Sequence, residues 1–114
     1  MSDSCVFCQI VAGNIPAEKL FENDQVIAIQ DIRAQAPKHF LVLPKKHIGT
    51  LADLEDVDAG LMGAIMLAVR DLAAKEGVSG GFRLVANNGE SAGQSVFHIH
   101  FHVLAGRKMG WPPG

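Results

Sequence analysis

Short apolar runs in the first half and the last third of the chain are typical of β-strands. In chain order they cover residues 19–22, 26–30, 39–43, 82–87 and 97–104. Asn23 and Asp24 lie between the first two runs and favour a turn, so these two runs predict a β-hairpin. The third run ends at Pro44, and the last two runs are joined by the polar, glycine-rich segment 88–94. The pattern therefore predicts five strands.

A spacing of three and four residues replaces these runs in the middle of the chain. The apolar residues with this spacing are Leu54, Val57, Leu61, Ile65, Ala68 and Leu72. They form one stripe of a helix, which we expect over residues 53–76 with Asp53 as its N-terminal cap. A shorter helix is expected over residues 5–12, because Ser4 can cap it and Gly13 is suited to end it.

These elements occur in the order of one helix, three strands, one helix and two strands. We therefore expect an α+β fold, in which a mostly antiparallel five-stranded sheet packs against one short and one long helix. The chain has 114 residues, of which 48% are hydrophobic and 19% charged. This is enough apolar material for one core, so residues 1–114 are expected to form a single domain.

Charge and cysteine content argue against several kinds of partner and location. The net charge of −2 lacks the basic footprint that binding to nucleic acid or an anionic membrane needs. The first ten residues lack the basic and the long apolar regions of a signal peptide, and no apolar run approaches the roughly 18 residues of a membrane span. Two cysteines are too few for a disulfide framework. We expect a cytoplasmic protein without a nucleic-acid or membrane partner.

Three of the five histidines, His98, His100 and His102, occupy alternate positions in the last predicted strand. Alternate side chains of a strand share a face, so neighbouring rings are expected about 6.6 Å apart on one face. The long helix is expected to cover the apolar residues that alternate with them, Ile99, Phe101 and Val103. Because imidazole has a pKa of about 6.5, one ring can act as a nucleophile or base while another donates a proton. Such a pair suits attack on phosphorus.

Polar residues close to these histidines in the sequence can help to bind an anion. Residues 93–95 (Gly-Gln-Ser) can offer backbone N–H groups and a hydroxyl, and Asn87 ends the neighbouring strand as a further donor. Two other roles for the histidines are structural hydrogen bonding and a zinc site. The first would bury three polar rings without a ligand, and the second would need ligands about 13 Å apart along one strand to reach a single ion.

The histidines lie within a longer pattern that resembles a known family. The H-φ-H-φ-H-φ-φ signature is that of the histidine triad nucleotide-binding proteins, and further segments over nearly the whole chain resemble the Hint branch of that family. These segments are Asp31-Ile32, Gln35-Ala36-Pro37, residues 39–48, Gly93-Gln94-Ser95-Val96 and Gly110-Trp111-Pro112-Pro113-Gly114.

The resemblance implies a homodimeric hydrolase that cleaves the P–N bond of purine nucleoside 5′-phosphoramidates, a range that can include aminoacyl-adenylates. His100 would attack the α-phosphorus to give a nucleotidyl-histidine intermediate, and water would then release the nucleoside monophosphate. His98 would orient and polarise the site, His102 would contact phosphate oxygens, and Ser95 would hydrogen-bond the leaving amine or the phosphate. No cofactor would be required for this reaction.

The resemblance also implies which residues bind the nucleotide. Asp31 would bind the ribose hydroxyls, Asn87 and the backbone at Gly93 would complete the phosphate cradle, and His39 would support the triad from behind. The other residues implied are Val6, Phe7, Ile10 and Ile29 as a slot for the purine ring, with Ile32, Gln94 and Val96 beside them. In this family the tail that contains Trp111 reaches the dimer partner near its active site.

Cys5 and Cys8 form a C-x-x-C pair, which supplies half of a tetrahedral zinc site. Some histidine triad proteins complete such a site with a histidine after the third strand and another from the triad, which implies His47 and His98 here. The alternative is that both cysteines are small apolar residues of the first helix. The sequence alone therefore does not decide between a structural zinc site and two apolar cysteines.

Two other functions remain open. Proteins of the Fhit-like branch carry the same triad and cleave dinucleoside polyphosphates, although the tail of this chain favours the Hint branch. A nucleotide-binding adaptor with weak activity would share most of the same pocket residues. Turnover of a phosphoramidate, of a diadenosine polyphosphate or of neither distinguishes the three functions.

Overall fold

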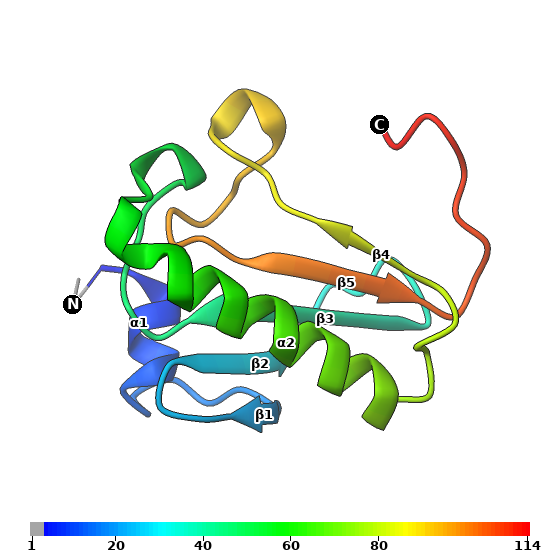
Figure 1. Ribbon diagram of the computed structural model, residues 1–114, viewed down its shortest axis with the longest axis horizontal. Coiled ribbons are helices and arrows are strands. Elements are labelled where there is room, and N and C mark those ends of the chain that lie inside the picture. Colours follow the sequence, from blue (N-terminus) through cyan, green and yellow to red (C-terminus); the bar gives the residue numbers. More distant parts are fainter. Residues whose placement is uncertain (1–3) are drawn as a thin grey trace.

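The computed structural model describes residues 4–114 and contains one five-stranded sheet with a helix on each side (Figure 1). The elements are α1 (Val6–Val11), β1 (Lys19–Glu22), β2 (Val26–Gln30), β3 (Lys38–Pro44), α2 (Ala59–Lys75), β4 (Phe82–Val85) and β5 (Phe101–Ala105). The strand order is β1-β2-β3-β5-β4, and each neighbouring pair is antiparallel. The predicted α+β fold, the sheet and the hairpin are confirmed. The part of the predicted domain before Ser4 lies outside the described residues.

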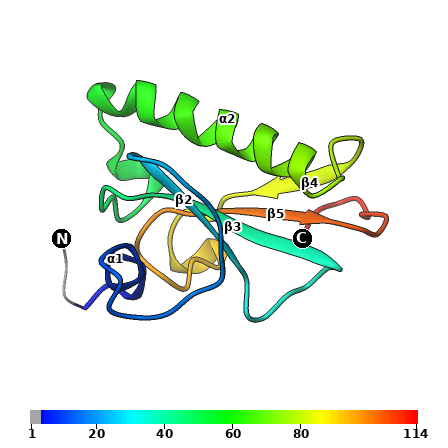
Figure 2. The same cartoon turned by 90° about the horizontal axis from the view of Figure 1, so that it is seen from below.

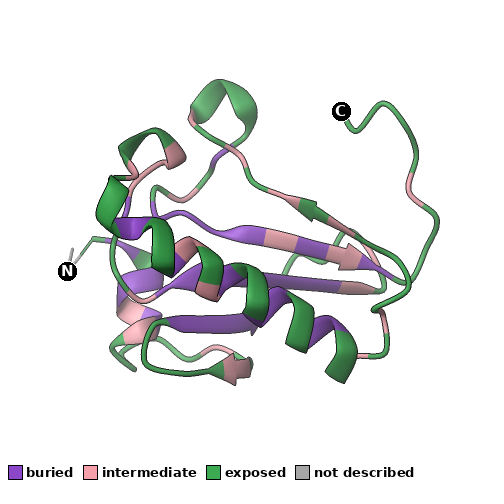
Figure 3. Ribbon diagram, viewed as in Figure 1, coloured by how far each residue is buried: buried purple, intermediate pink, exposed green. Residues whose placement is uncertain are grey.

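Strands β2 and β3 bury both of their faces, because α1 and α2 cover opposite sides of the sheet (Figure 2). The side chains on the α2 side are Val26, Ala28, Phe40 and Val42. Those on the α1 side are Ile27, Ile29, Leu41 and Leu43. The burial colouring shows β2 and β3 almost wholly buried, while the outward side of α2 is exposed (Figure 3). A continuous apolar run in the sequence thus corresponds here to a strand that is covered on both faces.

The long helix begins at Ala59, six residues later than expected. Residues 51–58 form two short 3₁₀ turns instead, and the carboxylates of Asp53 and Asp58 accept hydrogen bonds from the backbone nitrogens of Thr50 and Glu55. Each carboxylate therefore closes a turn of its own and does not cap α2. The prediction that Val57 faces the core was wrong, since it is 80% exposed, whereas the later members of the stripe are buried.

The last strand begins at Phe101 and not at residue 97, and β4 ends at Val85 and not at residue 87. The pairing of β5 with β3 stops at the Phe101 and Val42 pair. Before it, the backbone N–H of Ile99 donates to the carbonyl of Ile48 at 2.7 Å, so the chain leaves the sheet. His98 and His100 therefore precede the strand. Ile99, Phe101 and Val103 nevertheless lie in the core beneath α2, as expected.

Within residues 4–114, no helix has both the length and the apolar character that crossing a membrane requires.

Candidate active site

A cavity of about 620 Å³ lies on the α1 side of the sheet and brings together side chains from distant parts of the chain. The predicted site residues that line it are Val6, Phe7, Ile10, Ile29, Asp31, Ile32, His39, Ser95, Val96, His100 and His102. Most of its wall is apolar, and the polar side chains on it include Asp31, His100 and His102. A cavity with this division suits a ligand that has a flat apolar part and a polar part.

All three triad rings are on the α1 side, but only His100 and His102 line the cavity. The centroids of these two rings are 5.1 Å apart. His98 is fully buried, and its ring lies beside the two cysteines of α1. The expectation that all three histidines belong to the last strand was therefore wrong, because the chain bends away from β3 before Phe101 and carries His98 into a different environment.

The backbone carbonyl of His98 fixes the protonation state that His100 needs to act as a nucleophile. Its Nδ1 atom lies 2.8 Å from the carbonyl oxygen of His98, and a carbonyl can only accept, so Nδ1 carries the proton and donates. Nε2 of a neutral ring then holds a lone pair. Burial lowers the pKa of His100, which favours this neutral form at pH 7. The edge of the Phe7 ring packs against it at a centroid distance of 5.0 Å.

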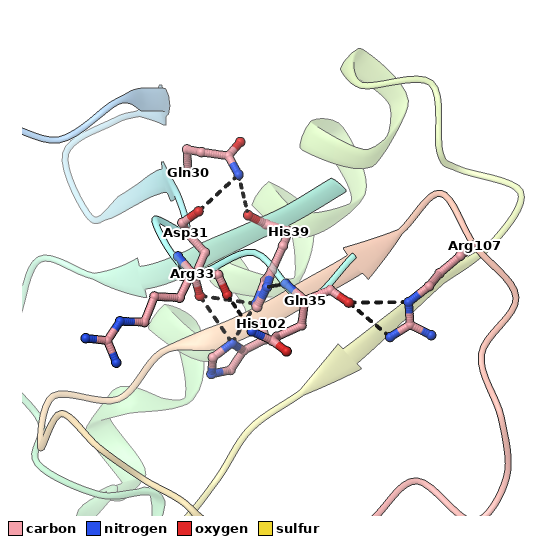
Figure 4. A network of polar contacts seen from close by, with 7 residues as sticks. All are labelled: Gln30, Asp31, Arg33, Gln35, His39, His102 and Arg107. Atoms are coloured by element: carbon pink, nitrogen blue, oxygen red, sulfur yellow. Dashed lines mark hydrogen bonds and ion pairs between the residues drawn. The ribbon is translucent and has the colours of Figure 1, made fainter. Parts of the chain in front are cut away.

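His102 belongs to a polar network with His39 and Asp31 (Figure 4). Nδ1 of His102 lies 2.9 Å from Nε2 of His39, which is also 3.2 Å from Oδ2 of Asp31. The other oxygen of Asp31 accepts a 2.7 Å hydrogen bond from the backbone nitrogen of Arg33. Burial, together with the neighbouring His100 and His39, lowers the pKa of His102 to about 4. His102 is therefore a neutral ring near pH 7.

The glycine-rich loop contributes less to the cavity than the sequence implies. Ser95 lies on its wall and is exposed, but Asn87, Gly93 and Gln94 are outside the lining. The buried amide of Gln94 donates to the carbonyl of Gly49 at 2.7 Å and accepts from the nitrogen of Gly89 at 2.8 Å. Gln94 thus braces the loop that presents Ser95.

A second cluster lies next to the cavity and consists of Cys5, Cys8, His47 and His98. Nδ1 of His98 is 3.4 Å and 3.6 Å from the sulfurs of Cys5 and Cys8, and Nδ1 of His47 is 3.2 Å from the sulfur of Cys8 and 3.2 Å from Nδ1 of His98. Ligands at the edges of a tetrahedron around zinc are about 3.3–3.8 Å apart, given Zn–S of about 2.3 Å and Zn–N of about 2.0–2.1 Å. The four donor atoms therefore fit a zinc ion.

Hydrogen bonds around this cluster also orient its donor atoms towards a metal ion. Nε2 of His98 lies 2.7 Å from the carbonyl oxygen of Pro44 and donates to it, which leaves the lone pair of Nδ1 directed at the cluster. The backbone nitrogen of Cys8 donates to the sulfur of Cys5 at 3.3 Å, at the start of α1. Burial raises the pKa of the Cys5 thiol. A bound cation would oppose this effect by stabilising the thiolate.

Two contacts of the site could not be seen in the sequence. The backbone nitrogen of Gln35 donates to Nδ1 of His39 at 2.9 Å, and the guanidinium of Arg107 donates to the carbonyl of Gln35 at 3.2–3.3 Å. The residue type at position 35 carries no signal for the first contact, because any residue except proline has the same backbone N–H.

Comparison with known proteins agrees with this fold. Residues 12–109 match the model of the HIT domain family. The chain is 41% identical over 114 residues to an uncharacterised HIT-like protein of Synechococcus elongatus, with both chains fully covered. A HIT family hydrolase of Legionella pneumophila has a similar structure, with a TM-score of 0.96, 49% identity and coverage of 97% of this chain and 100% of that chain. A histidine triad nucleotide-binding protein of Candida albicans is also similar, with a TM-score of 0.83 and 32% identity. The match covers 96% of this chain and 83% of that chain. The chain therefore belongs to the HIT domain family.

Proposed function

We propose that this protein is a nucleotide-binding hydrolase that cleaves the P–N bond of purine nucleoside 5′-phosphoramidates, with aminoacyl-adenylates as further substrates. The observation that carries the proposal is the state of His100. Its Nδ1–H is committed to the carbonyl of His98, so the lone pair of Nε2 is available to a substrate in the cavity. The HIT hydrolase of Legionella pneumophila and the nucleotide-binding protein of Candida albicans support the general class.

In the proposed reaction, Nε2 of His100 attacks the α-phosphorus, the P–N bond breaks and the amine leaves with a proton from a neighbouring donor, which regains a proton from the water of the second step. In an aminoacyl-adenylate the bond that breaks is the P–O bond, and a carboxylate leaves. Water then attacks the same phosphorus, the bond to His100 breaks and the nucleoside monophosphate is released. Ser95 and His102 line the cavity beside His100 and are the donors proposed for the leaving amine and the phosphate oxygens.

The rest of the cavity accounts for the nucleoside. Val6, Phe7, Ile10 and Ile29 provide an apolar slot for the purine, and burying the base there removes its faces from water. Asp31 lies on the cavity wall, where its carboxylate can accept hydrogen bonds from the ribose hydroxyls. The predicted roles of Asn87, Gly93 and Gln94 are proposed only as support for the loop, since these residues do not line the cavity.

Steady-state hydrolysis tests the proposal directly. Adenosine and guanosine 5′-phosphoramidates should be turned over faster than diadenosine triphosphate by a factor of 100 or more. The reverse order would favour a dinucleoside polyphosphate hydrolase. Tight binding of AMP without turnover of either substrate would favour the adaptor function, because binding needs the cavity but not the nucleophile.

We further propose that Cys5, Cys8, His47 and His98 bind a structural zinc ion. When bound, the ion would supply a cross-link between the start of α1 and the segments that follow β3 and precede β5. The hydrolytic steps proposed above use only side chains and water, so the reaction itself requires no cofactor. His98 would therefore orient the site through its backbone carbonyl while its ring holds the metal.

The homodimer and the cytoplasmic location remain proposals. Strand β4 is an edge strand, and its side chains Phe82 and Leu84 are each 37% exposed. Figure 1 shows α2 crossing the middle of the sheet and leaving β4 uncovered. Trp111 is 84% exposed and lies outside the cavity lining of its own chain. A second copy of the chain would cover these groups, and sedimentation of a monomer at all concentrations would refute the dimer.

A further inference from the structure

His39 is almost fully buried behind the triad, and its ring contacts polar groups from three other positions in the chain (Figure 4). Its Nδ1 atom lies 2.9 Å from the backbone nitrogen of Gln35. Its Nε2 atom lies 2.9 Å from Nδ1 of His102 and 3.2 Å from Oδ2 of Asp31. A ring nitrogen can donate or accept, so the location of each proton follows from what the partner atom can do.

The backbone N–H of Gln35 can only donate, so Nδ1 of His39 accepts and carries no proton. A neutral imidazole then has its single proton on Nε2, and this N–H points to Nδ1 of His102. Two protons cannot occupy a gap of 2.9 Å between two nitrogens, so Nδ1 of His102 must accept. The proton of neutral His102 is therefore on Nε2, the nitrogen left to meet a ligand.

We infer that His39 is a positioning residue that holds His102 in the tautomer whose Nε2–H donates to a phosphate oxygen of the substrate. This role rests on the proposed function. His100 has the complementary state, because its Nδ1–H donates to the carbonyl of His98 and Nε2 holds a lone pair. Two neighbouring rings thus offer one nucleophilic lone pair and one hydrogen-bond donor. The reverse tautomer of His102 would turn a second lone pair towards an anionic phosphate, which is repulsive.

The three side chains Asp31, His39 and His102 also have the composition of a metal site. A metal ion on Nε2 of His39 would need the lone pair there and the proton on Nδ1. The backbone N–H of Gln35 already points at Nδ1, so two protons would face each other across 2.9 Å. The chain of hydrogen bonds is therefore favoured over a metal ion at this cluster.

Two-bond ¹H–¹⁵N correlation spectra of the ligand-free, ¹⁵N-labelled full chain distinguish the two tautomers of each histidine. Two variants form a matched pair: His39→Gln retains an N–H donor at the position of Nε2, and His39→Met has similar volume without a donor. We expect the Nε2–H form of His102 in the wild type and in His39→Gln, and a mixture of tautomers in His39→Met. We also expect His39→Met to lower kcat for adenosine 5′-phosphoramidate by about 10- to 100-fold with KM changed less than about 3-fold, and His39→Gln to restore most of it.

A wild-type spectrum with the proton on Nδ1 of His102 would overturn the inference, even if His39→Met does not fold. A folded His39→Met variant with wild-type tautomer and turnover would also overturn it. A titration with Zn²⁺ gives a third such outcome. If one further equivalent, added after the cluster with His47 and His98 is filled, perturbs the signals of His39 and His102, the inference is overturned. The expected tautomers in a wild-type protein that turns over no phosphoramidate would refute the proposed function alone and leave the hydrogen-bond assignment in place.

Discussion

The backbone carbonyl of His98 accepts the Nδ1–H of His100 at 2.8 Å, while the ring of His98 faces the thiols of Cys5 and Cys8. One residue therefore belongs to two sites. Its ring contributes to the candidate zinc cluster, and its carbonyl sets the tautomer of the proposed nucleophile. His98 is fully buried and its Nε2 donates to the carbonyl of Pro44, so its ring is held in place.

Replacing the proposed nucleophile separates chemistry from binding. We expect His100→Ala to lower turnover of adenosine 5′-phosphoramidate by about 10⁴-fold or more, because it removes the lone pair that is proposed to attack phosphorus. Binding of AMP should weaken by less than about 10-fold, since the apolar slot and Asp31 are unchanged. Steady-state kinetics and calorimetric titration with AMP measure the two effects. Near-wild-type turnover by His100→Ala would refute the mechanism.

Removing one thiol tests the candidate metal site. We expect the wild type to contain one zinc ion per chain and Cys8→Ser to contain none, because three ligands hold zinc much more weakly than four. Loss of the ion removes its contribution to the folding free energy, so the Tm should fall by about 10 °C or more. In a small domain, a loss of 1 kcal/mol corresponds to about 4–8 °C. Elemental analysis and thermal unfolding measure these changes. Gln9→Ala, one position further along α1, is the matched control and should retain its zinc. Zinc at wild-type stoichiometry in Cys8→Ser would contradict the assignment.

The low pKa of His102 predicts that the protein loses stability in mild acid. The folded-state pKa of about 4 lies below the ordinary value of 6.5, so the unfolded chain binds more protons between these two values. Stability is therefore fully present above pH 6.5 and declines as the pH falls towards 4. From pH 7 to pH 5 this ring alone should cost about 2 kcal/mol.

Urea unfolding of the wild type and of His102→Gln at pH 7 and pH 5 measures this contribution. The groups that face the ring are His39, His100 and Asp31, and they are present in both proteins. The difference between the two pH slopes therefore gives the contribution of His102 together with its coupling to these groups. Equal slopes would show that its pKa is not depressed.

Position 106 requires glycine for two reasons, the conformation of its backbone and its closeness to Pro37. Its φ of +92° lies in the left-handed region, and a Cβ there would be 2.8 Å from Cβ of Pro37. We expect Gly106→Ala to lower the free energy of unfolding by about 2–4 kcal/mol. Gly63→Ala is the matched control, because Gly63 lies within α2 and a Cβ there has no neighbour within 4 Å. That substitution should stabilise the protein by up to about 1 kcal/mol, so urea unfolding should give effects of opposite sign.

The element types and the chemical character of the site follow from local features of the sequence. Alternation and turn residues predicted the hairpin over 19–22 and 26–30, and a spacing of three and four predicted the core stripe from Leu61 to Leu72. The alternation of His98 to Val103 predicted which side chains lie beneath α2. These inferences hold because burial imposes the same period on the sequence as on the backbone.

The remaining features depend on contacts between residues far apart in the chain. The late start of α2 is an exception, because it follows from a local contact in which the carboxylate of Asp58 accepts from the backbone of Glu55, and the pairing of Asp58 with Lys46 at 2.6 Å supports it. His98 is separated from His100 and His102 because the backbone N–H of Ile99 donates a hydrogen bond to the carbonyl of Ile48, where the chain leaves β3. The tautomer of His102 traces to the backbone N–H of Gln35, 67 residues away (102 − 35) in the sequence. A residue pattern records which side chains are present, but hydrogen bonds to backbone groups depend on where the folded chain places them.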